Sequence, residues 1–518
     1  MYNKQSANRH RCGGIITIQK EAVKMRPNIL YIMCDQFRYD CIAALSNNKI
    51  RTPNLDRLVK RGVAFTNAYS SCPVCIPARY NIRTGREPFH TGCYLNETPT
   101  PLDGLATDME ERCGKYLART LQDRGYRTFG VGKFHTAPDW LENTGFDVML
   151  HVEELWCTRE ERRQDAYANF IMSQHPEYSH IEQLHGERTE MYYIPQTSPF
   201  PKELKSEAFV ADRAVELMGV EDQRPWFGFV SFIGPHPPFA PPIPYNRMYD
   251  PDGMQNPVVG TPENDLMDEQ LLFMNHLIWA DEINDFLARG AKSRYYGLIS
   301  YIDDCIGKIL DRVEVMSDPD NVLIAFFSDH GDLLGDHRSW QKESYFEQAA
   351  HIPFLLSWPK RLKKDMRDDH LVCLTDLFAV ATAASGACET RDGQDILGIL
   401  DGVVPPRDFL FACYGRPGTP LFKFMVRRGD YKYIFMSNGG RRQLFNLKND
   451  PNELENLAET ETETLRELHG IALGYARRPG LYPAFEAEDF KIFPYVERPM
   501  ERINQMAFDL GVTDFAVK

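Results

Sequence analysis

The chain has 518 residues, 43% of them hydrophobic and 12% aromatic, which is enough to bury a large core and a second, smaller one. Its formal net charge of -14 argues against the clustered cations that nucleic-acid binding needs. No run of about 18 apolar residues is present that could cross a membrane. We therefore expect a compact globular protein that binds neither nucleic acid nor membranes, and its oligomeric state stays open.

Residues 1–24 are basic and polar, and their only apolar run is the short segment Ile15–Ile18. Such a run is too short for the core of a signal peptide. We expect residues 1–24 to be an N-terminal extension that either has no fixed structure or results from an upstream start of translation. A cytoplasmic protein is the corresponding prediction.

From Asn28 onward, apolar runs of strand length alternate with helical stretches, which is typical of a parallel sheet covered by helices. Residues 28–34 predict a buried strand that delivers Asp35 and Gln36 at its end. Residues 53–61 predict a helix that begins with proline and stops at a glycine, and residues 63–69 predict a second strand.

Further along the chain we expect a helix at residues 116–124, closed by a glycine, and strands at residues 128–131, 226–233 and 321–327. These three strands are followed by Lys133, His236 and Asp329. Side chains able to bind a metal or an anion therefore follow several predicted strands, at the sheet edge where open α/β proteins place their sites.

The last part of the chain has a different pattern. Residues 422–430 and 431–435 predict a strand, a turn and a strand, and residues 443–447 predict another strand, followed at 448–457 by a turn and the start of a helix. We expect a catalytic domain at residues 25–400 and a smaller α+β subdomain with an antiparallel sheet at residues 401–518.

Asp35 and Asp329 are candidate metal ligands from two different strands, with Gln36 and His330 beside them. Either aspartate alone would more often be a helix cap or a turn residue, but its position at the end of a strand favours a role as a metal ligand. An oxygen-rich site favours Ca²⁺ or Mg²⁺, and the imidazole shifts the preference toward Mn²⁺.

The twelve cysteines form no dense framework, and the pair Cys72 and Cys75 has the CxxC spacing of a redox or zinc pair. No second CxxC and no HxxxH accompanies it, so zinc is the weaker interpretation.

Two segments carry a family resemblance. The spacing Cys75-x-Pro77-x-Arg79, followed by Thr84-Gly85, resembles the signature of type I sulfatases, and Gly125 to His135 matches the second signature of that family. The resemblance covers about residues 28–458. It implies an alkaline-phosphatase-like fold, a large mixed, mostly parallel sheet flanked by helices, with a smaller C-terminal domain carrying an antiparallel sheet.

In that family a maturation enzyme oxidises the signature cysteine to formylglycine, and the resemblance assigns this change to Cys75. The hydrated aldehyde would attack the sulfate ester and would add an oxygen ligand to the metal, which is most often Ca²⁺. Arg79 would orient the modified residue. By the same resemblance, Lys133, His135 and Lys342 would hold the sulfate and His236 would protonate the leaving alcohol. The list of expected catalytic residues is thus Cys75, Arg79, Lys133, His135, His236 and Lys342.

Some residues depart from the usual family pattern. Gln36 and His330 stand where many sulfatases have Asp and Asn, and they are more similar to the phosphonate monoesterase and choline sulfatase branches. A phosphonate monoester hydrolase or phosphodiesterase is therefore the alternative function. Lys133 and His135 favour a sulfatase that acts on a small anionic sulfate ester, and a carbohydrate sulfate is one candidate because so many relatives use one.

Other features have less defined expectations. Ile76 and Arg83 also depart from the family pattern, and Arg83 is a candidate for lining the pocket. His337 is expected to be structural. Residues 148–203 and the tail after 482 match nothing recognisable, and the polar and aromatic groups Glu154, Trp156 and 159–163 are expected to shape the substrate pocket.

Overall fold

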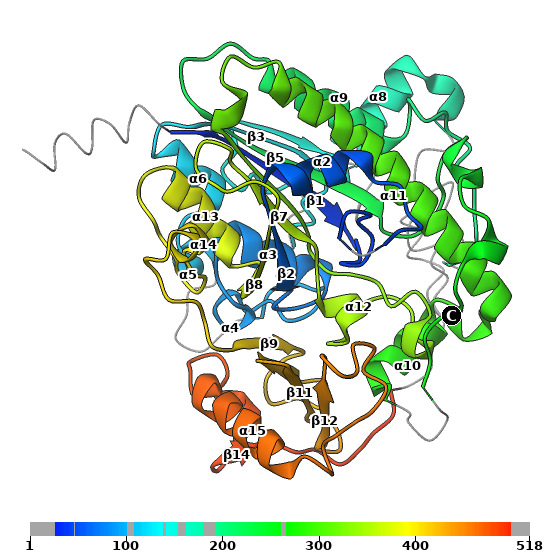
Figure 1. Ribbon diagram of the computed structural model, residues 1–518, viewed down its shortest axis with the longest axis vertical. Helices are drawn as coiled ribbons and strands as arrows, with labels where there is room; N and C mark the ends of the chain where they lie inside the picture. Colours follow the sequence, from blue (N-terminus) through cyan, green and yellow to red (C-terminus); the bar gives the residue numbers. More distant parts are fainter. Residues whose placement is uncertain are drawn as a thin grey trace, which may run out of the picture.

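The structure of the protein is a computed structural model that describes residues 26–45, 47–100, 108–137, 141–153, 162–179, 193–260 and 266–498. The predicted N-terminal extension and Glu154, Trp156 and 159–161 lie outside these ranges. A large sheet with helices on both faces stands above a smaller four-stranded sheet (Figure 1).

The large sheet has eight strands in the order β4-β3-β5-β1-β6-β7-β2-β8. All neighbouring pairs are parallel except those of β7, which runs antiparallel to β6 and β2. The bounds are β1 Asn28–Asp35, β2 Val63–Tyr69, β3 Arg127–Gly132, β4 Val148–His151, β5 Trp226–Pro235, β6 Val322–Ser328, β7 Phe354–Ser357 and β8 Met366–Cys373. The mixed, mostly parallel sheet predicted from the sequence is confirmed.

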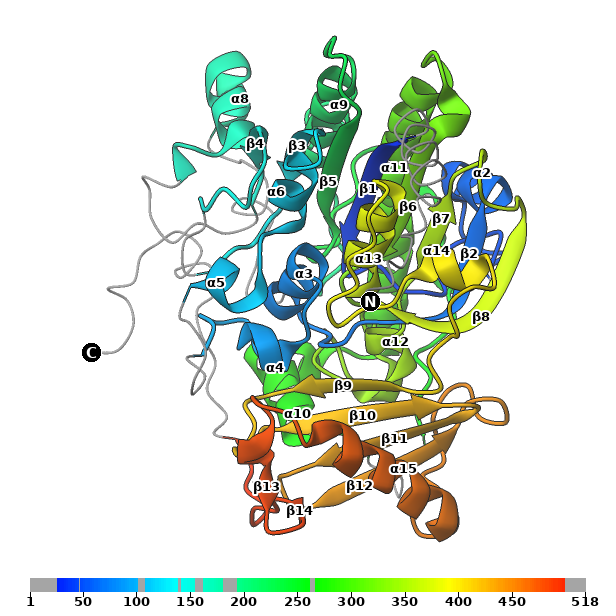
Figure 2. The ribbon, with the colours of Figure 1, turned by 90° about the vertical axis from the view of Figure 1, so that its left-hand side faces the viewer.

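Alternate side chains of β1 enter two different cores, which explains its continuous apolar run. Leu30 and Ile32 pack with helices α2, α9 and α11 on one face, and Ile29 and Tyr31 pack with α3, α6, α13 and α14 on the other (Figure 2). The helices of the domain are α2 Pro53–Arg61, α3 Cys75–Thr84, α4 Pro88–Thr91, α5 Met109–Cys113, α6 Leu117–Gln122, α8 Ala166–Gln174, α9 Ser206–Met218, α10 Glu269–Leu277, α11 Asp285–Glu314, α12 Glu347–Ala350, α13 Asp376–Ala384 and α14 Ile396–Leu400.

The smaller sheet is antiparallel, in the order β12-β11-β10-β9, and helix α15 packs on its outer face (Figure 2). Its elements are β9 Leu410–Tyr414, β10 Lys423–Arg428, β11 Tyr431–Met436, β12 Arg441–Asn446 and α15 Thr462–Ala476, followed by the short pair β13 Phe485–Glu486 and β14 Asp489–Phe490. The antiparallel C-terminal sheet is thus confirmed.

The prediction of a helix start within residues 448–457 is wrong, because the helix begins only at Thr462. The intervening chain is held against β12: Leu457 N–H donates to the Leu444 carbonyl, and Leu444 N–H donates to the Asn456 side chain. Glu453 has a positive φ of 56°, which breaks any helical run at that position.

The two sheets are connected by a buried ion cluster around Lys432 of β11. Its ammonium lies 2.8 Å from Glu347 of α12 and 2.5 Å from Glu453, and it also donates to the Tyr345 carbonyl. Burial raises the pKa of Glu453 to about 7. Burial alone would also raise the pKa of Glu347, but the Lys432 charge holds it well below its usual value. One cation thus compensates two carboxylates that come from different parts of the chain.

We expect Lys432→Met to lower the free energy of unfolding by about 3–5 kcal/mol, because it leaves two buried carboxylates facing each other. The measurement is urea unfolding followed by circular dichroism. Lys448→Met is the matched control, since that side chain is 74% exposed. Equal effects of the two substitutions would contradict the role given to the cluster.

Candidate functional site

The predicted strand ends meet at one edge of the sheet. Strands β3, β5, β1 and β6 are consecutive neighbours, and Cys34 of β1 pairs with Ser328 of β6. Their C-terminal ends therefore bring Asp35, Lys133, His236 and Asp329 to the same region. Helix α3 begins there as well, with Cys75 as its first residue.

Four candidate metal ligands surround a common point. One donor atom each from Asp35, Cys75, Asp329 and His330 all lie within 4.8 Å of one another, and all four residues are buried. The His330 Nε2 atom is 3.2 Å from the Cys75 sulfur and 3.7 Å from each Asp Oδ1 atom. Asp329 and Cys75 are 254 positions apart in the sequence, yet they belong to the same cluster.

His330 has the protonation state that a metal ligand needs. Burial lowers its pKa to about 4, so the ring is neutral at pH 7. Its Nδ1 atom lies 3.0 Å from the Gly331 carbonyl oxygen, to which only a protonated nitrogen can donate. The lone pair is then on Nε2, the atom that faces the two carboxylates.

The second oxygen of Asp35 faces two cations. Its Oδ2 atom is 2.6 Å from the Lys133 ammonium and 2.8 Å from the Arg79 guanidinium. Burial alone would raise the pKa of Asp35, but the charges of Lys133 and Arg79 hold it well below its usual value. Arg79 Nε also lies 3.2 Å from Asp329 Oδ2. The cations thus contact the Oδ2 atoms, and the Oδ1 atoms lie toward His330. Asp329 Oδ1 also accepts from the backbone N–H groups of Gln36 and His330.

Gln36 is oriented by partners that the sequence did not indicate. Its amide nitrogen donates to the Tyr193 hydroxyl at 3.0 Å and to Asp332 at 2.5 Å. The amide oxygen therefore points the other way and accepts from the Lys342 ammonium at 2.8 Å. Gln36 is the predicted ligand with the least direct support, since its oxygen is engaged by this lysine.

Lys342 is held beside Cys75 by an unusual backbone. Its ammonium lies 3.2 Å from the Cys75 sulfur, and the residues on both sides, Gln341 and Glu343, have positive φ angles of 75° and 69°. Such conformations are uncommon for residues other than glycine and cost free energy, so they are found where the surroundings impose them. Glu343 N–H donates to the Pro73 carbonyl, which ties the lysine to the segment before Cys75.

The turn after β3 carries Lys133 and His135. It begins at Gly132, where φ is 116° and a Cβ atom would lie 1.8 Å from the Ser231 carbonyl oxygen, so only glycine fits. His135 has a positive φ of 50°, and its N–H donates to the Glu153 carboxylate. Glu153 also accepts from Phe134 N–H at 2.7 Å. Sequence analysis did not identify Glu153, because it lies in a segment without a recognisable motif.

The remaining predicted residues are also buried. His236 is 5% exposed, and its Nδ1 atom lies 2.8 Å from the Pro237 carbonyl oxygen, to which a protonated Nδ1 donates. Arg83 is buried as well, with Nη1 donating to the Thr136 hydroxyl. His337 stacks on Phe346 with ring centroids 3.8 Å apart, which agrees with a structural role.

The Cys75 thiol is not activated in this environment. It is fully buried, and burial together with the Asp35 charge raises its pKa to about 12. Reactive cysteines have the opposite property, because the thiolate is the nucleophile. Cys72 lies in the same segment, but its sulfur contacts the Tyr94 carbonyl oxygen at 3.6 Å. Cys72 is absent from the ligand cluster around Cys75, so the described residues do not form a CxxC metal site.

Comparisons with known proteins agree with this geometry. The sulfatase family model matches residues 27–387, and the C-terminal model of N-sulphoglucosamine sulphohydrolase matches residues 335–469. An arylsulfatase of Clostridium perfringens is 28% identical over 478 residues, covering 87% of this chain and 96% of that protein. A choline-sulfatase of Rhizobium meliloti is 28% identical, covering 84% of this chain and 83% of that protein.

The fold is also similar to solved structures. A phosphonate monoester hydrolase of Agrobacterium radiobacter superposes with a TM-score of 0.71 at 23% identity, covering 87% of this chain and 94% of that one. A protein solved with its substrate D-glucosamine-2-N,6-O-disulfate has a TM-score of 0.66 at 18% identity, covering 88% and 99%. Because the family model spans more than half of the chain, this protein belongs to the sulfatase family, the sulfuric ester hydrolases of the alkaline phosphatase superfamily.

Proposed function

We propose that the protein hydrolyses a sulfate ester to an alcohol and inorganic sulfate, with Cys75 converted to formylglycine and one divalent metal ion bound beside it. The observation that carries the proposal is the single buried cluster of Cys75, Asp35, Asp329 and His330, with lysines in contact with the Cys75 sulfur. A sulfatase needs these groups together, because the nucleophile, the metal and the cations all act on one sulfate group.

The donor set fits a divalent metal ion. Two carboxylate Oδ1 atoms and a neutral imidazole nitrogen face one another, and the neighbouring cations contact the opposite oxygens of the carboxylates. Asp35, Asp329 and His330 would hold the ion, with residue 75 and Gln36 completing the set. When bound, the ion would polarise an oxygen of the nucleophile and neutralise charge on the sulfate. Ca²⁺ suits the oxygen-rich set best, and the imidazole keeps Mn²⁺ and Mg²⁺ as alternatives.

Formylglycine would supply a hydrated aldehyde, which has one hydroxyl for attack on sulfur and a second for the later release of sulfate. The thiol of Cys75 occupies the place of these oxygens in the present structure. Because Cys75 is fully buried, the maturation enzyme that we propose as a partner has to act before the chain folds. Arg79 would fix the modified residue through its contacts with both aspartates.

The chain's own cations are placed to hold the sulfate. The ammonium groups of Lys342 and Lys133 lie 3.2 Å and 4.0 Å from the Cys75 sulfur, so both can donate to oxygens of a group bound there. His135 follows Lys133 on the same clamped turn and would add a donor. His236 would give the proton to the leaving alcohol from Nε2, since its Nδ1 donates to a backbone carbonyl.

The proposed substrate class is a carbohydrate sulfate. An ulvan-active sulfatase of Formosa agariphila is 28% identical over 348 residues, and human iduronate 2-sulfatase is 24% identical over 359 residues. The alternative function is that of a phosphonate monoester hydrolase. It is favoured by the residue pair Gln36 and His330 and by the structural similarity to two such enzymes. Lys133 and His135 favour the sulfatase.

The test of the function compares 4-nitrophenyl sulfate with the phenyl ester of phenylphosphonic acid at equal concentration. We expect kcat/KM for the sulfate to exceed that for the phosphonate. A reversed preference, measured on protein with converted Cys75, would favour the alternative enzyme class.

Cys75→Ala should lower sulfatase kcat by about 10⁴-fold or more without changing the fold, because the nucleophile is removed. Activity is measured with 4-nitrophenyl sulfate and folding by circular dichroism. The matched control is Cys72→Ala, the other cysteine of the CxxC pair, which should keep most of the activity. Equal losses of sulfatase activity in the two variants would instead indicate that Cys72 and Cys75 act together as a pair.

Removal of divalent metal with EDTA should abolish activity and lower Tm, and addition of Ca²⁺ or Mn²⁺ should restore both. The increase in Tm is measured by thermal denaturation and does not depend on turnover. Asp329→Asn should lose most of the metal-dependent shift, because one carboxylate ligand becomes a neutral amide. A full shift in this variant would remove Asp329 from the ligand set.

A further inference from the structure

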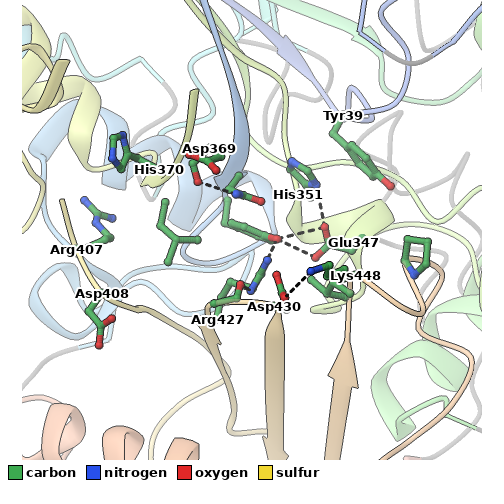
Figure 3. Close-up of a pocket in the computed structure, with 16 residues that line it drawn as sticks. Tyr39, Glu347, His351, Asp369, His370, Arg407, Asp408, Arg427, Asp430 and Lys448 are labelled. Atoms are coloured by element: carbon green, nitrogen blue, oxygen red, sulfur yellow. Dashed lines mark hydrogen bonds and ion pairs between the residues drawn. The ribbon is translucent and has the colours of Figure 1, made fainter. Parts of the chain in front are cut away.

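A cavity of about 610 Å³ lies between the two sheets, away from the candidate active site. Its walls come from the end of β2, the middle of β8, α12 and the β10–β11 turn (Figure 3). None of the predicted catalytic or metal-binding residues lines it. The volume is in the range of small-molecule sites, which often form between domains.

Arg427 of β10 supplies to this cavity a cation that has no carboxylate partner among the described residues. The residue is only 6% exposed, and its partners are neutral: the Tyr69 hydroxyl and the backbone carbonyls of Gly429 and Tyr431. Among the described residues, no carboxylate forms an ion pair with this guanidinium, and its hydrogen bonds are made by Nε and Nη1. Buried arginines are normally paired with an anion, so the Arg427 guanidinium is a suitable partner for an anionic group of a ligand.

Stacked aromatic rings form part of the cavity wall. The ring of Tyr39 stacks on His351 with centroids 4.0 Å apart and planes at 10°, and Tyr69 stacks on the same imidazole at 5.1 Å. His351 is fixed in turn by Glu347 at 2.8 Å. Such a rigid surface suits the flat apolar face of a ring-shaped ligand.

Hydrogen-bond acceptors complete the lining. Asp369 of β8 and Asp408, which precedes β9, border the cavity, and Asn67 lies beside Asp369, to whose carbonyl its amide donates at 2.7 Å. Asp408 also accepts from Arg428 Nε through Oδ2, at 2.8 Å. Carboxylates accept hydrogen bonds from hydroxyl groups but repel a ligand that is anionic throughout. The ligand therefore has one anionic group and several hydroxyls.

We propose that this cavity binds an acidic sugar residue, with its carboxylate or sulfate group on Arg427, its ring on Tyr39 and its hydroxyls on Asp369 and Asp408. The inference goes beyond the proposed hydrolysis and depends on neither Cys75 nor turnover. It gives the protein a second point of attachment for saccharides.

The test is calorimetric titration of the full chain with sodium glucuronate, glucose and sodium sulfate as separate probes. Glucuronate should bind saturably and more tightly than either glucose, which lacks the anion, or sulfate, which lacks the ring. Arg427→Gln should weaken glucuronate binding by about 10-fold or more, the usual effect of losing a charge-assisted hydrogen bond. Arg416→Gln, an exposed arginine of the same domain outside the cavity, is the matched control.

Tyr39→Leu provides a second test if Arg427→Gln fails to keep the wild-type Tm. Loss of the ring should weaken binding of both glucuronate and glucose. Unchanged glucuronate binding in a folded Arg427→Gln or Tyr39→Leu protein would overturn the proposal. Sulfate binding as tightly as glucuronate would also overturn it, by showing a plain anion site. Loss of sulfatase activity alone has no bearing on this result.

Discussion

The charge balance around Asp35 is the constraint on which the rest of the site depends. Three cations, Arg79, Lys133 and Lys342, stand with two carboxylates, Asp35 and Asp329, and each of these residues is at most 4% exposed. Burying so many charges is costly unless each has a partner. The pairing determines which carboxylate oxygens face the cations and which face His330. Because the cations outnumber these carboxylates, a bound metal ion would increase a local excess of positive charge. A protein with a net charge of -14 can thereby bind an anionic ester.

The backbone contributes by holding uncommon conformations next to this cluster. Gly132 permits the close approach of β3 to β5, Glu153 clamps the turn that carries His135, and positive φ angles flank Lys342. The C-terminal sheet also contributes, because its Lys432 fixes Glu347, which lies five positions after Lys342. The smaller sheet is thus connected to the segment that carries Lys342 of the candidate active site, which gives a physical reason for the two sheets to form one unit.

The sequence was sufficient where local pattern determines geometry. Continuous apolar strands ending in Asp35 and Asp329 predicted that these two side chains meet, as they do in the structure, since parallel strands place their carboxyl ends together. The sequence was insufficient to predict a side-chain contact when the hydrogen-bond partner comes from a remote segment. Tyr193 and Asp332 orient Gln36 from 157 and 296 positions away, and no local pattern marks them. The wrong helix start before Thr462 has the same cause, because contacts with β12 override the local preference.

Conversion of Cys75 is the central claim, and the most direct measurement is peptide mass spectrometry across this residue, on protein produced together with a formylglycine-generating enzyme. We expect a mass decrease of about 18 Da in that peptide, the change from thiol to aldehyde. An unmodified Cys75, under conditions in which a known sulfatase is converted, would contradict the account.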